Sequence, residues 1–356
     1  MKKLATLAMG LLLSMSVMAN TAYEQGLYYY NLGTDDGYRQ AFSYFHQAAE
    51  QGDDKAQLVL GAMYDEGVGI QQNYHQAVHW YKKAANQGLA EAQYNLGLMY
   101  EKGYGVHQDY HQAFNWFAKA ANQGYASAQH NLGLMYEKGY GVRQDYQKAV
   151  EWYTKAANQG LAEAQTNLGL MYEKGHGVRQ DYQKAVEWYA KAANQGLAEA
   201  QVNLGYMYGH GYGVRQDYKQ AFNWFAKAAA QNNAVAQYNL GVMYRQGQGV
   251  RQDYHQAVQW YTKAANQGHA GAQVNLGNMY RHGYGVRQDY KQAFNWYAKA
   301  TAQNNAMAQY NIATLYYNGW GVRQSYSLAK QWLGKACDNG YQDGCDAYRE
   351  LNQQGY

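Results

Sequence analysis

Residues 126–160 read ASAQHNLGLMYEKGYGVRQDYQKAVEWYTKAANQG, and close copies of this stretch fill most of the 356-residue chain. One tyrosine of the stretch recurs at a constant step of 36 residues, at Tyr38, Tyr74, Tyr110, Tyr146, Tyr182, Tyr218, Tyr254, Tyr290 and Tyr326. Because no copy carries an insertion, we expect every copy to adopt the same backbone. Such a period is typical of stacked solenoids, in which each copy buries its apolar face only against its neighbours.

Each copy begins a helix at the recurring tyrosine, and we call this the Tyr helix. In residues 110–121 the apolar side chains recur every three or four residues, which marks one helical face. Asp109 precedes them as an N-cap, and Gln112 completes a capping box. The pattern stops at Gly124, in the C′ position that favours a left-handed backbone. Asparagine, the next best residue there, replaces this glycine at Asn232 and Asn304.

A second helical pattern, which we call the Leu-Gly helix, runs over about residues 126–138 and contains Leu132 and Gly133. A glycine inside a helix costs about 1 kcal/mol against alanine, so its recurrence requires a physical reason. We expect close contact with a neighbouring helix, and Ala313, the next smallest residue, fits this expectation. The other copies have Gly61, Gly97, Gly169, Gly205, Gly241 and Gly277 at this position.

The shared pattern A-x-A-Q-x-N-L-G-x-M-Y-x-x-G-x-G-V-x-x-D-Y-x-x-A-x-x-W-Y-x-K-A-A-x-x-G resembles the Sel1-like repeat, a relative of the tetratricopeptide repeat, over residues 38–340. The loops differ from many Sel1 loops in having arginine where proline often follows the valine. The resemblance implies an all-α fold, a right-handed α/α superhelical solenoid of 36-residue helical hairpins. We expect about nine units, with residues 20–53 as an N-terminal capping unit, 54–340 as the Sel1-like repeat solenoid and 341–356 as a C-terminal capping helix.

Residues 1–19 have the features of a secretory signal peptide. Lys2 and Lys3 precede an apolar run from Leu4 to Met18, and small residues lead up to Ala19. The run is short for a spanning helix, although a membrane anchor is the alternative. We predict cleavage after Ala19, a periplasmic or secreted location, no transmembrane segment and a monomer. The net charge of +4 is near neutral for this length and gives no argument for a nucleic-acid partner.

Two cysteines, Cys337 and Cys345, flank an apparent helix-ending turn at residues 338–340. Two antiparallel helices joined there would bring the sulfur atoms together, and export would permit a disulfide. Two free thiols are the alternative. The last unit is similar to cysteine-rich Sel1-like proteins, some of which bind or weakly hydrolyse β-lactams.

In proteins that this chain resembles, the Leu-Gly helix lines the concave side of the superhelix. An asparagine precedes the leucine in seven copies, and its amide both donates and accepts hydrogen bonds, which suits the backbone of an extended peptide. The alternative is an asparagine that braces a neighbouring helix. The seven are Asn95, Asn131, Asn167, Asn203, Asn239, Asn275 and Asn311.

Variation between copies falls mainly on this same helix. Residues 146–181 and 182–217 differ at six positions, and four of them, including Leu170/Tyr206, lie on or beside the outward stripe of the Leu-Gly helix. Lys102, Lys138 and Lys174 would make the first half of the groove basic, partly offset by three neighbouring glutamates. We therefore predict a non-catalytic scaffold that binds a peptide or protein partner in its groove, without a metal or a cofactor.

Three further motifs have competing interpretations. Ser327 and Lys330 match S-x-x-K, the pattern behind the alternative function of a β-lactam-binding or weakly β-lactam-hydrolysing protein, although S-D-N and K-T-G are absent. His75 and His79 have a spacing that can share a metal but lack a third ligand. The loop arginines could follow an anionic polymer, or be solvated or paired with the capping aspartates; they are Arg143, Arg179, Arg215, Arg251, Arg287 and Arg323.

Overall fold

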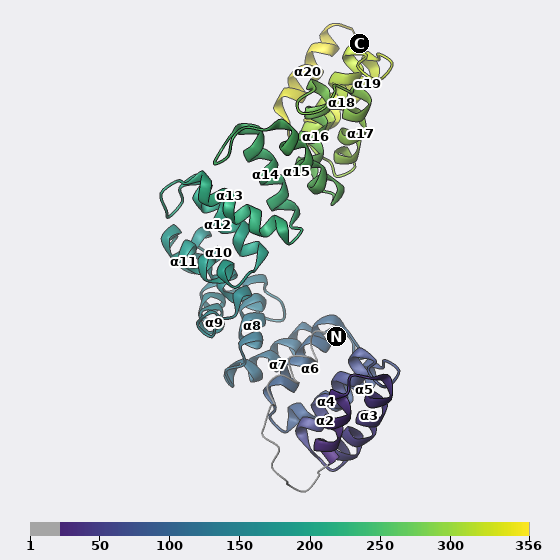
Figure 1. Cartoon of the computed structure of the whole chain (residues 1–356), viewed down its shortest axis with the longest axis vertical. Coiled ribbons are helices and arrows are strands. Elements are labelled where there is room, and N and C mark those ends of the chain that lie inside the picture. The colour runs from purple at the N-terminus through teal and green to yellow at the C-terminus, as the bar shows by residue number, and fades with distance from the viewer. Residues whose placement is uncertain (1–21, 356) are drawn as a thin grey trace. The chain divides into compact units, whose positions relative to one another are not determined.

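The computed structural model describes residues 22–355, so the expected signal peptide, residues 1–19, lies outside the described residues. Within the described range the chain forms nineteen α-helices and no strand, which confirms the all-α expectation. The helices fall into two compact units, one ending at Gln180 and the other beginning at Asp181. Within each unit every helix packs against the next one in chain order, as Figure 1 shows.

The first unit holds four Tyr helices and five Leu-Gly or equivalent helices. They are α2 (Ala22–Asn31), α3 (Asp35–Glu50), α4 (Asp54–Glu66), α5 (Tyr74–Asn86), α6 (Ala90–Lys102), α7 (Tyr110–Asn122), α8 (Ala126–Lys138), α9 (Tyr146–Asn158) and α10 (Ala162–Lys174). The second unit continues the alternation. Its helices are α11 (Tyr182–Asn194), α12 (Ala198–His210), α13 (Tyr218–Ala230), α14 (Ala234–Gln246), α15 (Tyr254–Asn266), α16 (Ala270–His282), α17 (Tyr290–Thr301), α18 (Ala306–Asn318), α19 (Tyr326–Asp338) and α20 (Gln342–Gln353).

The helix ends follow from side chains that the repeat supplies. Asp109 caps α7 as predicted, because its carboxylate accepts from the backbone N–H groups of His111 and Gln112. The capping box predicted for Gln112 does not form. The Gln112 side-chain oxygen would have to accept from the backbone N–H of Asp109, but this N–H donates instead to the carbonyl of Tyr100 at 2.9 Å. The connecting loop is thus held to the preceding Leu-Gly helix.

Left-handed residues end the Tyr helices as predicted. Gly124 has φ of 91°, and Asn232 and Asn304 adopt the same conformation with φ of 63° and 58°. These two asparagines are the only non-glycine residues with positive φ in the described range 22–355. Asparagine tolerates this backbone at low cost because its short polar side chain bonds locally.

The mid-helix glycines provide the close contact that their recurrence predicts. A Cβ built on Gly97 would lie 2.6 Å from the ring of Phe117 in the next Tyr helix, and one on Gly241 would lie 2.6 Å from the ring of Tyr261. The ring therefore occupies the space that a side chain would need. In the last copy Ala313 replaces the glycine, and Leu333 replaces the ring within the same apolar cluster.

A row of buried glutamine amides links each copy to the next, which sequence reasoning missed. Gln129 is 5% exposed, and its Nε2 donates to the carbonyl of Ala121 at 3.1 Å. Its Oε1 accepts at 2.8 Å from Nε2 of Gln159, which directly follows the next Tyr helix. The same contacts recur in both units, so this polar row is part of the core. The other glutamines whose Oε1 accepts from a side-chain amide 30 residues later include Gln57, Gln93, Gln201, Gln237, Gln273 and Gln309.

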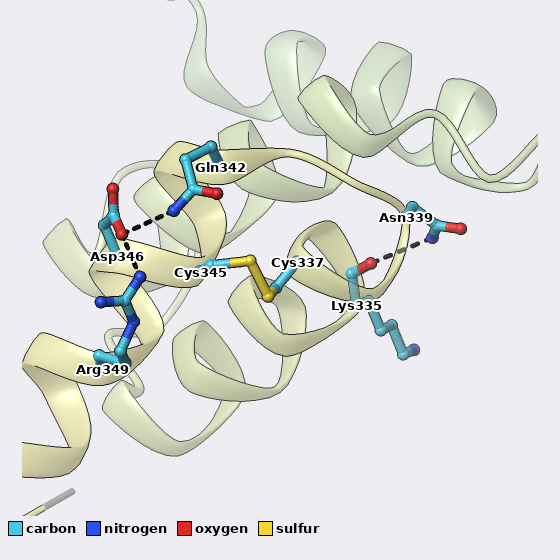
Figure 2. Close-up of a disulfide and its surroundings, with 7 residues drawn as sticks. All are labelled: Lys335, Cys337, Asn339, Gln342, Cys345, Asp346 and Arg349. Atoms are coloured by element: carbon cyan, nitrogen blue, oxygen red, sulfur yellow. Dashed lines mark hydrogen bonds and ion pairs between the residues drawn. A yellow bond between two sulfur atoms is a disulfide. The ribbon is translucent and has the colours of Figure 1, made fainter.

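The last two helices hold the cysteines side by side. The sulfur atoms of Cys337 in α19 and Cys345 in α20 lie at bonding distance, with 4.5 Å between the Cα atoms (Figure 2). The intervening turn is fixed by Asn339, whose side chain donates to the carbonyl of Lys335 at 3.0 Å. No helix within residues 22–355 is long and apolar enough to cross a bilayer.

Candidate functional site

We use the name Leu-Gly face for the outward positions of the Leu-Gly helices in each unit, which are those of the predicted asparagines, the three lysines and Tyr206. Six of the seven asparagines are half-buried on this face. Asn311 is an exception, since only 6% of it is exposed and it belongs to the interior of the second unit. We therefore leave Asn311 out of the proposed binding surface. The half-buried members are Asn95, Asn131, Asn167, Asn203, Asn239 and Asn275.

Several of these amides already contact the protein itself. Nδ2 of Asn167 lies 2.9 Å from Nε2 of His130 in the preceding copy. Asn239 donates to the carbonyl of Val235 within its own helix at 2.9 Å. Asn131 and Asn275 lie beside the hydroxyls of Tyr94 and Tyr261. Bracing between copies, the alternative to ligand binding, thus accounts for part of the repetition.

The three lysines of the first unit lie at the ends of α6, α8 and α10 and are exposed. Nζ of Lys138 lies 2.6 Å from a carboxylate oxygen of Glu137, and this contact raises the lysine pKa. Lys102 lies over the ring of Tyr104, 5.7 Å from its centroid. Glu137 thus offsets the charge of Lys138, one of the three lysines expected to make this part of the face basic.

Tyr206, the aromatic residue predicted on this face, is 43% exposed. Its ring centroid lies 3.9 Å from that of His210, and the His210 ring stacks on Tyr212 with 5.6 Å between centroids. Nδ1 of His210 lies 2.9 Å from the carbonyl oxygen of Tyr206, which fixes the imidazole. These three rings contact one another and form an aromatic surface, and aromatic side chains often contribute most of the binding free energy of an interface.

A second contact joins the ends of the Leu-Gly helices α4 and α8 to the Tyr helices that follow them. In the first unit the hydroxyl of Tyr153 donates to Oε2 of Glu137 at 2.7 Å, and Tyr81 approaches Asp65 at 3.4 Å. Burial first, and then the neighbouring carboxylate, raises the pKa of both tyrosines well above its ordinary value. Sequence reasoning did not pair these residues, although their constant separation of 16 residues was visible.

The S-x-x-K motif and the histidine pair lie in ordinary helical surroundings. Ser325 caps α19 by accepting from the N–H of Leu328, so Ser327 and Lys330 lie in an ordinary first turn. The ammonium of Lys330 lies 5.8 Å from the ring centroid of Tyr348. Within residues 22–355 no group of three or more His, Cys, Asp or Glu side chains is arranged to hold a metal.

The loop arginines are exposed in both units. The ion pairs seen at two capping aspartates involve lysines instead: Lys148 with Asp145 at 4.0 Å and Lys184 with Asp181 at 3.9 Å. Solvation is therefore the better description of the loop arginines than pairing with the caps.

Comparison with known protein families finds nine consecutive matches to the Sel1 repeat, which together span most of the chain. They cover residues 13–53, 54–89, 90–125, 126–161, 162–197, 198–233, 234–269, 270–305 and 306–341. No curated protein matches the chain.

Two similar solved structures cover most of the chain. A Sel1 repeat protein from Oxalobacter formigenes is 33% identical, with 98% of this chain and 99% of that chain covered and a TM-score of 0.67. A protective antigen of uropathogenic Escherichia coli strains with an SLR fold is 34% identical, with 94% and 87% covered and a TM-score of 0.61. Cysteine rich protein B of Helicobacter pylori is 25% identical, with 37% and 95% covered and a TM-score of 0.31.

Proposed function

Because the chain belongs to the Sel1 repeat family, we propose that it is an exported, non-catalytic scaffold that binds a peptide or protein partner on its Leu-Gly face. One observation carries the proposal: the buried contacts of the copies are nearly constant, whereas the outward position after the glycine is not. That position is Leu98, Leu134, Leu170, Tyr206, Val242, Asn278 and Thr314 in successive copies. A constant interior with a varied accessible face is how repeat proteins present binding surfaces.

The exposed members of the face are the best candidates for partner contact. They are Lys102, Lys138 and Lys174 in the first unit and Tyr206 in the second, and the half-buried asparagines of each unit supply polar groups. Aromatic side chains in the centre of an interface commonly contribute most of the binding free energy. Tyr206 should therefore matter more than any single lysine.

The test is site-specific cross-linking in the native cell. A photoreactive phenylalanine analogue at position 206 should capture a defined partner, and the same analogue at exposed position 147 on a Tyr helix should not. Capture should be lost when Lys102, Lys138 and Lys174 are changed to glutamine in the protein that carries the analogue at position 206. The matched control changes Lys119, Lys155 and Lys191, three exposed lysines of the Tyr helices, to glutamine. Equal capture of the partner at positions 147 and 206 would contradict the proposal.

Export can be tested separately. We expect the mature protein to begin at Asn20, with a mass that lacks the first 19 residues, and to be released with the periplasmic or culture fraction. Cys337 and Cys345 should then resist alkylation until a reductant is added, as a disulfide requires. Retention of Met1 and recovery in the cytoplasm would contradict export.

The rival β-lactam function makes a distinct prediction about Ser327. A serine nucleophile would give nitrocefin turnover that disappears in Ser327→Ala, or an acyl-enzyme mass with penicillin. The scaffold proposal expects neither, because Ser327 lies in the first turn of α19 beside the capping Ser325.

A further inference from the structure

The last turn of the Leu-Gly helix changes its charge between the two units. In the first unit this position carries Glu101 and Glu137, and the carboxylate of Glu137 accepts from the Tyr153 hydroxyl. In the second unit the same position is Gly209, Arg245, Arg281 and Tyr317, so two of its four copies carry an arginine. The tyrosines that correspond to Tyr153 in these two copies are Tyr261 and Tyr297, which are buried. The same scaffold position therefore presents a carboxylate in the first unit and a guanidinium in two copies of the second.

Both guanidinium groups lie beside buried tyrosine hydroxyls without a carboxylate. Burial raises the pKa of Tyr261 and Tyr297, and no acidic residue contributes to either shift. The adjacent arginine partly offsets the effect of burial, in Tyr297 also through a hydrogen bond from the Arg281 side chain. The hydroxyl of Tyr297 donates to Oδ1 of Asn278 at 2.6 Å. The proton of the Tyr297 hydroxyl is therefore already used in a hydrogen bond to Asn278.

Each arginine retains an unused donor. Nε of Arg245 and Nε of Arg281 are buried and make no hydrogen bond. The guanidinium carbon of Arg281 lies 5.4 Å from the ring centroid of Trp320. A cation that is partly removed from water without an anion carries an uncompensated desolvation cost. An incoming carboxylate would offset that cost, because its negative charge pairs with the guanidinium and it accepts strong hydrogen bonds from a charged donor.

The carboxylates nearest in sequence are not available to do this. Residues 201–336 contain 13 Lys and Arg but only three Asp and Glu, in a chain whose net charge is +4. The three are Asp217, Asp253 and Asp289, and each caps a Tyr helix by accepting backbone N–H groups. The region thus combines a large positive charge with carboxylates that are already engaged.

We propose that Arg245 and Arg281 form an anion-binding strip on the second unit, which holds carboxylate side chains of an acidic peptide segment. The inference rests on the proposed function and names the charge of the ligand. Both side chains are partly buried, so a slender carboxylate side chain reaches them more readily than a nucleic-acid backbone does. The strip and the Tyr206 surface lie in the same unit.

The test measures binding of fluorescein-labelled octaglutamate to the full-length mature protein by fluorescence anisotropy at low salt. The double variant R245E/R281E should weaken binding by at least about tenfold, as loss of partly buried charge pairs does. It should fold, because glutamate is the residue that the first unit carries at this position. Circular dichroism and thermal melting verify the fold.

The matched control is R251E/R287E, which makes the same charge change at two exposed loop arginines. We expect it to weaken binding by no more than about twofold, since exposed charges contribute little. Octaglutamine should not bind the wild-type protein. An octathymidylate that binds more tightly than octaglutamate, with the same dependence on Arg245 and Arg281, would assign the strip to nucleic acid and overturn the proposal.

Two other results would also overturn it: equal losses in the two double variants, or no saturable binding of octaglutamate to the wild-type protein. The outcome is separable from that of the proposed function. A partner that cross-links at position 206 while octaglutamate fails to bind removes only the acidic-peptide assignment. Binding of octaglutamate through Arg245 and Arg281, without any cross-linked partner, removes only the scaffold role.

Discussion

Each mid-helix glycine and the ring that covers it constrain one another. Phe117 is fully buried, and its ring leaves no room for a side chain at position 97. We predict that Gly97→Ala destabilises the protein by about 1 kcal/mol, because overpacking of about 1–3 kcal/mol exceeds the gain of about 1 kcal/mol in helix propensity. Denaturant unfolding followed by circular dichroism measures this.

The chain itself supplies the rescue, since Ala313 and Leu333 form the equivalent pair in the last copy. Phe117→Leu alone should cost about 1 kcal/mol through the cavity it leaves. The double variant should be more stable than the sum of the two single changes by about 1 kcal/mol, as expected for residues in direct contact. Strict additivity would show that the glycine is retained for some other reason.

The buried glutamine row predicts an unusual cost for a polar-to-apolar change. Gln129→Leu removes one hydrogen bond from each of two groups, the carbonyl of Ala121 and the amide of Gln159. Each group keeps a second partner in Gly124, so we expect a loss of about 1–2 kcal/mol, the net contribution of two intramolecular hydrogen bonds. Gln147→Leu, at an exposed position of α9, should change the free energy of unfolding by less than about 0.5 kcal/mol. A comparable loss in both variants would contradict the role assigned to the row.

Side chains that act across copies were the hardest to predict from the sequence. The mid-helix glycines predicted a close contact but not its partner ring, because the ring lies in the next helix. No contact was predicted for Gln129, because its two partners are a backbone carbonyl and a side chain 30 residues away. The asparagines were predicted either to bind a ligand or to brace a neighbouring helix, and Asn167 contacts His130 of the preceding copy. In each case the missing information was the stacking geometry.

At the scale of the helix, local chemistry decided the outcome and the sequence was a good guide. Aspartate caps and left-handed glycines or asparagines begin and end the Tyr helices as predicted. The Leu-Gly helices are capped less regularly. Asn233 and Asn305 cap α14 and α18 with side-chain oxygens, whereas His269 caps α16 by accepting from the N–H of Ala272 at 3.1 Å.

The histidine cap should make the stability of α16 depend on pH. Burial lowers the pKa of His269 below its ordinary 6.5, so the unfolded chain takes up a proton more readily than the folded chain. The stabilisation is therefore complete above pH 6.5 and is lost as pH falls through the lowered folded pKa. A protonated imidazole has no free lone pair to accept the Ala272 N–H.

We predict that His269→Asn keeps the cap and removes this part of the pH dependence, since asparagine does the same work at positions 233 and 305. The difference in stability between wild type and variant should grow by up to about 1 kcal/mol, the usual value of an N-cap, between about pH 7.5 and about pH 5. Thermal melts at both pH values measure it, and NMR titration of His269 checks the pKa. A constant difference would show that the cap does not titrate.

For the molecule as a whole, the repeat makes stability a sum over neighbours, and the two ends are the weak points because each has one neighbour only. The ends are built differently. At the N-terminal end of the described residues, α2 contacts α3 through apolar and aromatic side chains such as Tyr23 and Phe45. At the other end the Cys337–Cys345 contact joins α19 to α20 in addition to packing.

This difference predicts how the stability of the two ends responds to replacement of Cys337 and Cys345. A cross-link that closes a loop of about nine residues should stabilise its segment by roughly 2–3 kcal/mol. The double variant C337S/C345S should therefore lose hydrogen-exchange protection in α20, and to a smaller extent in α19, while α2 and α3 keep theirs. Because each copy interacts only with its neighbours, the loss should fade within about one copy of the cross-link. Loss of protection along the entire chain would mean that the array unfolds as one cooperative unit, and the neighbour-by-neighbour account of its stability would have to be abandoned.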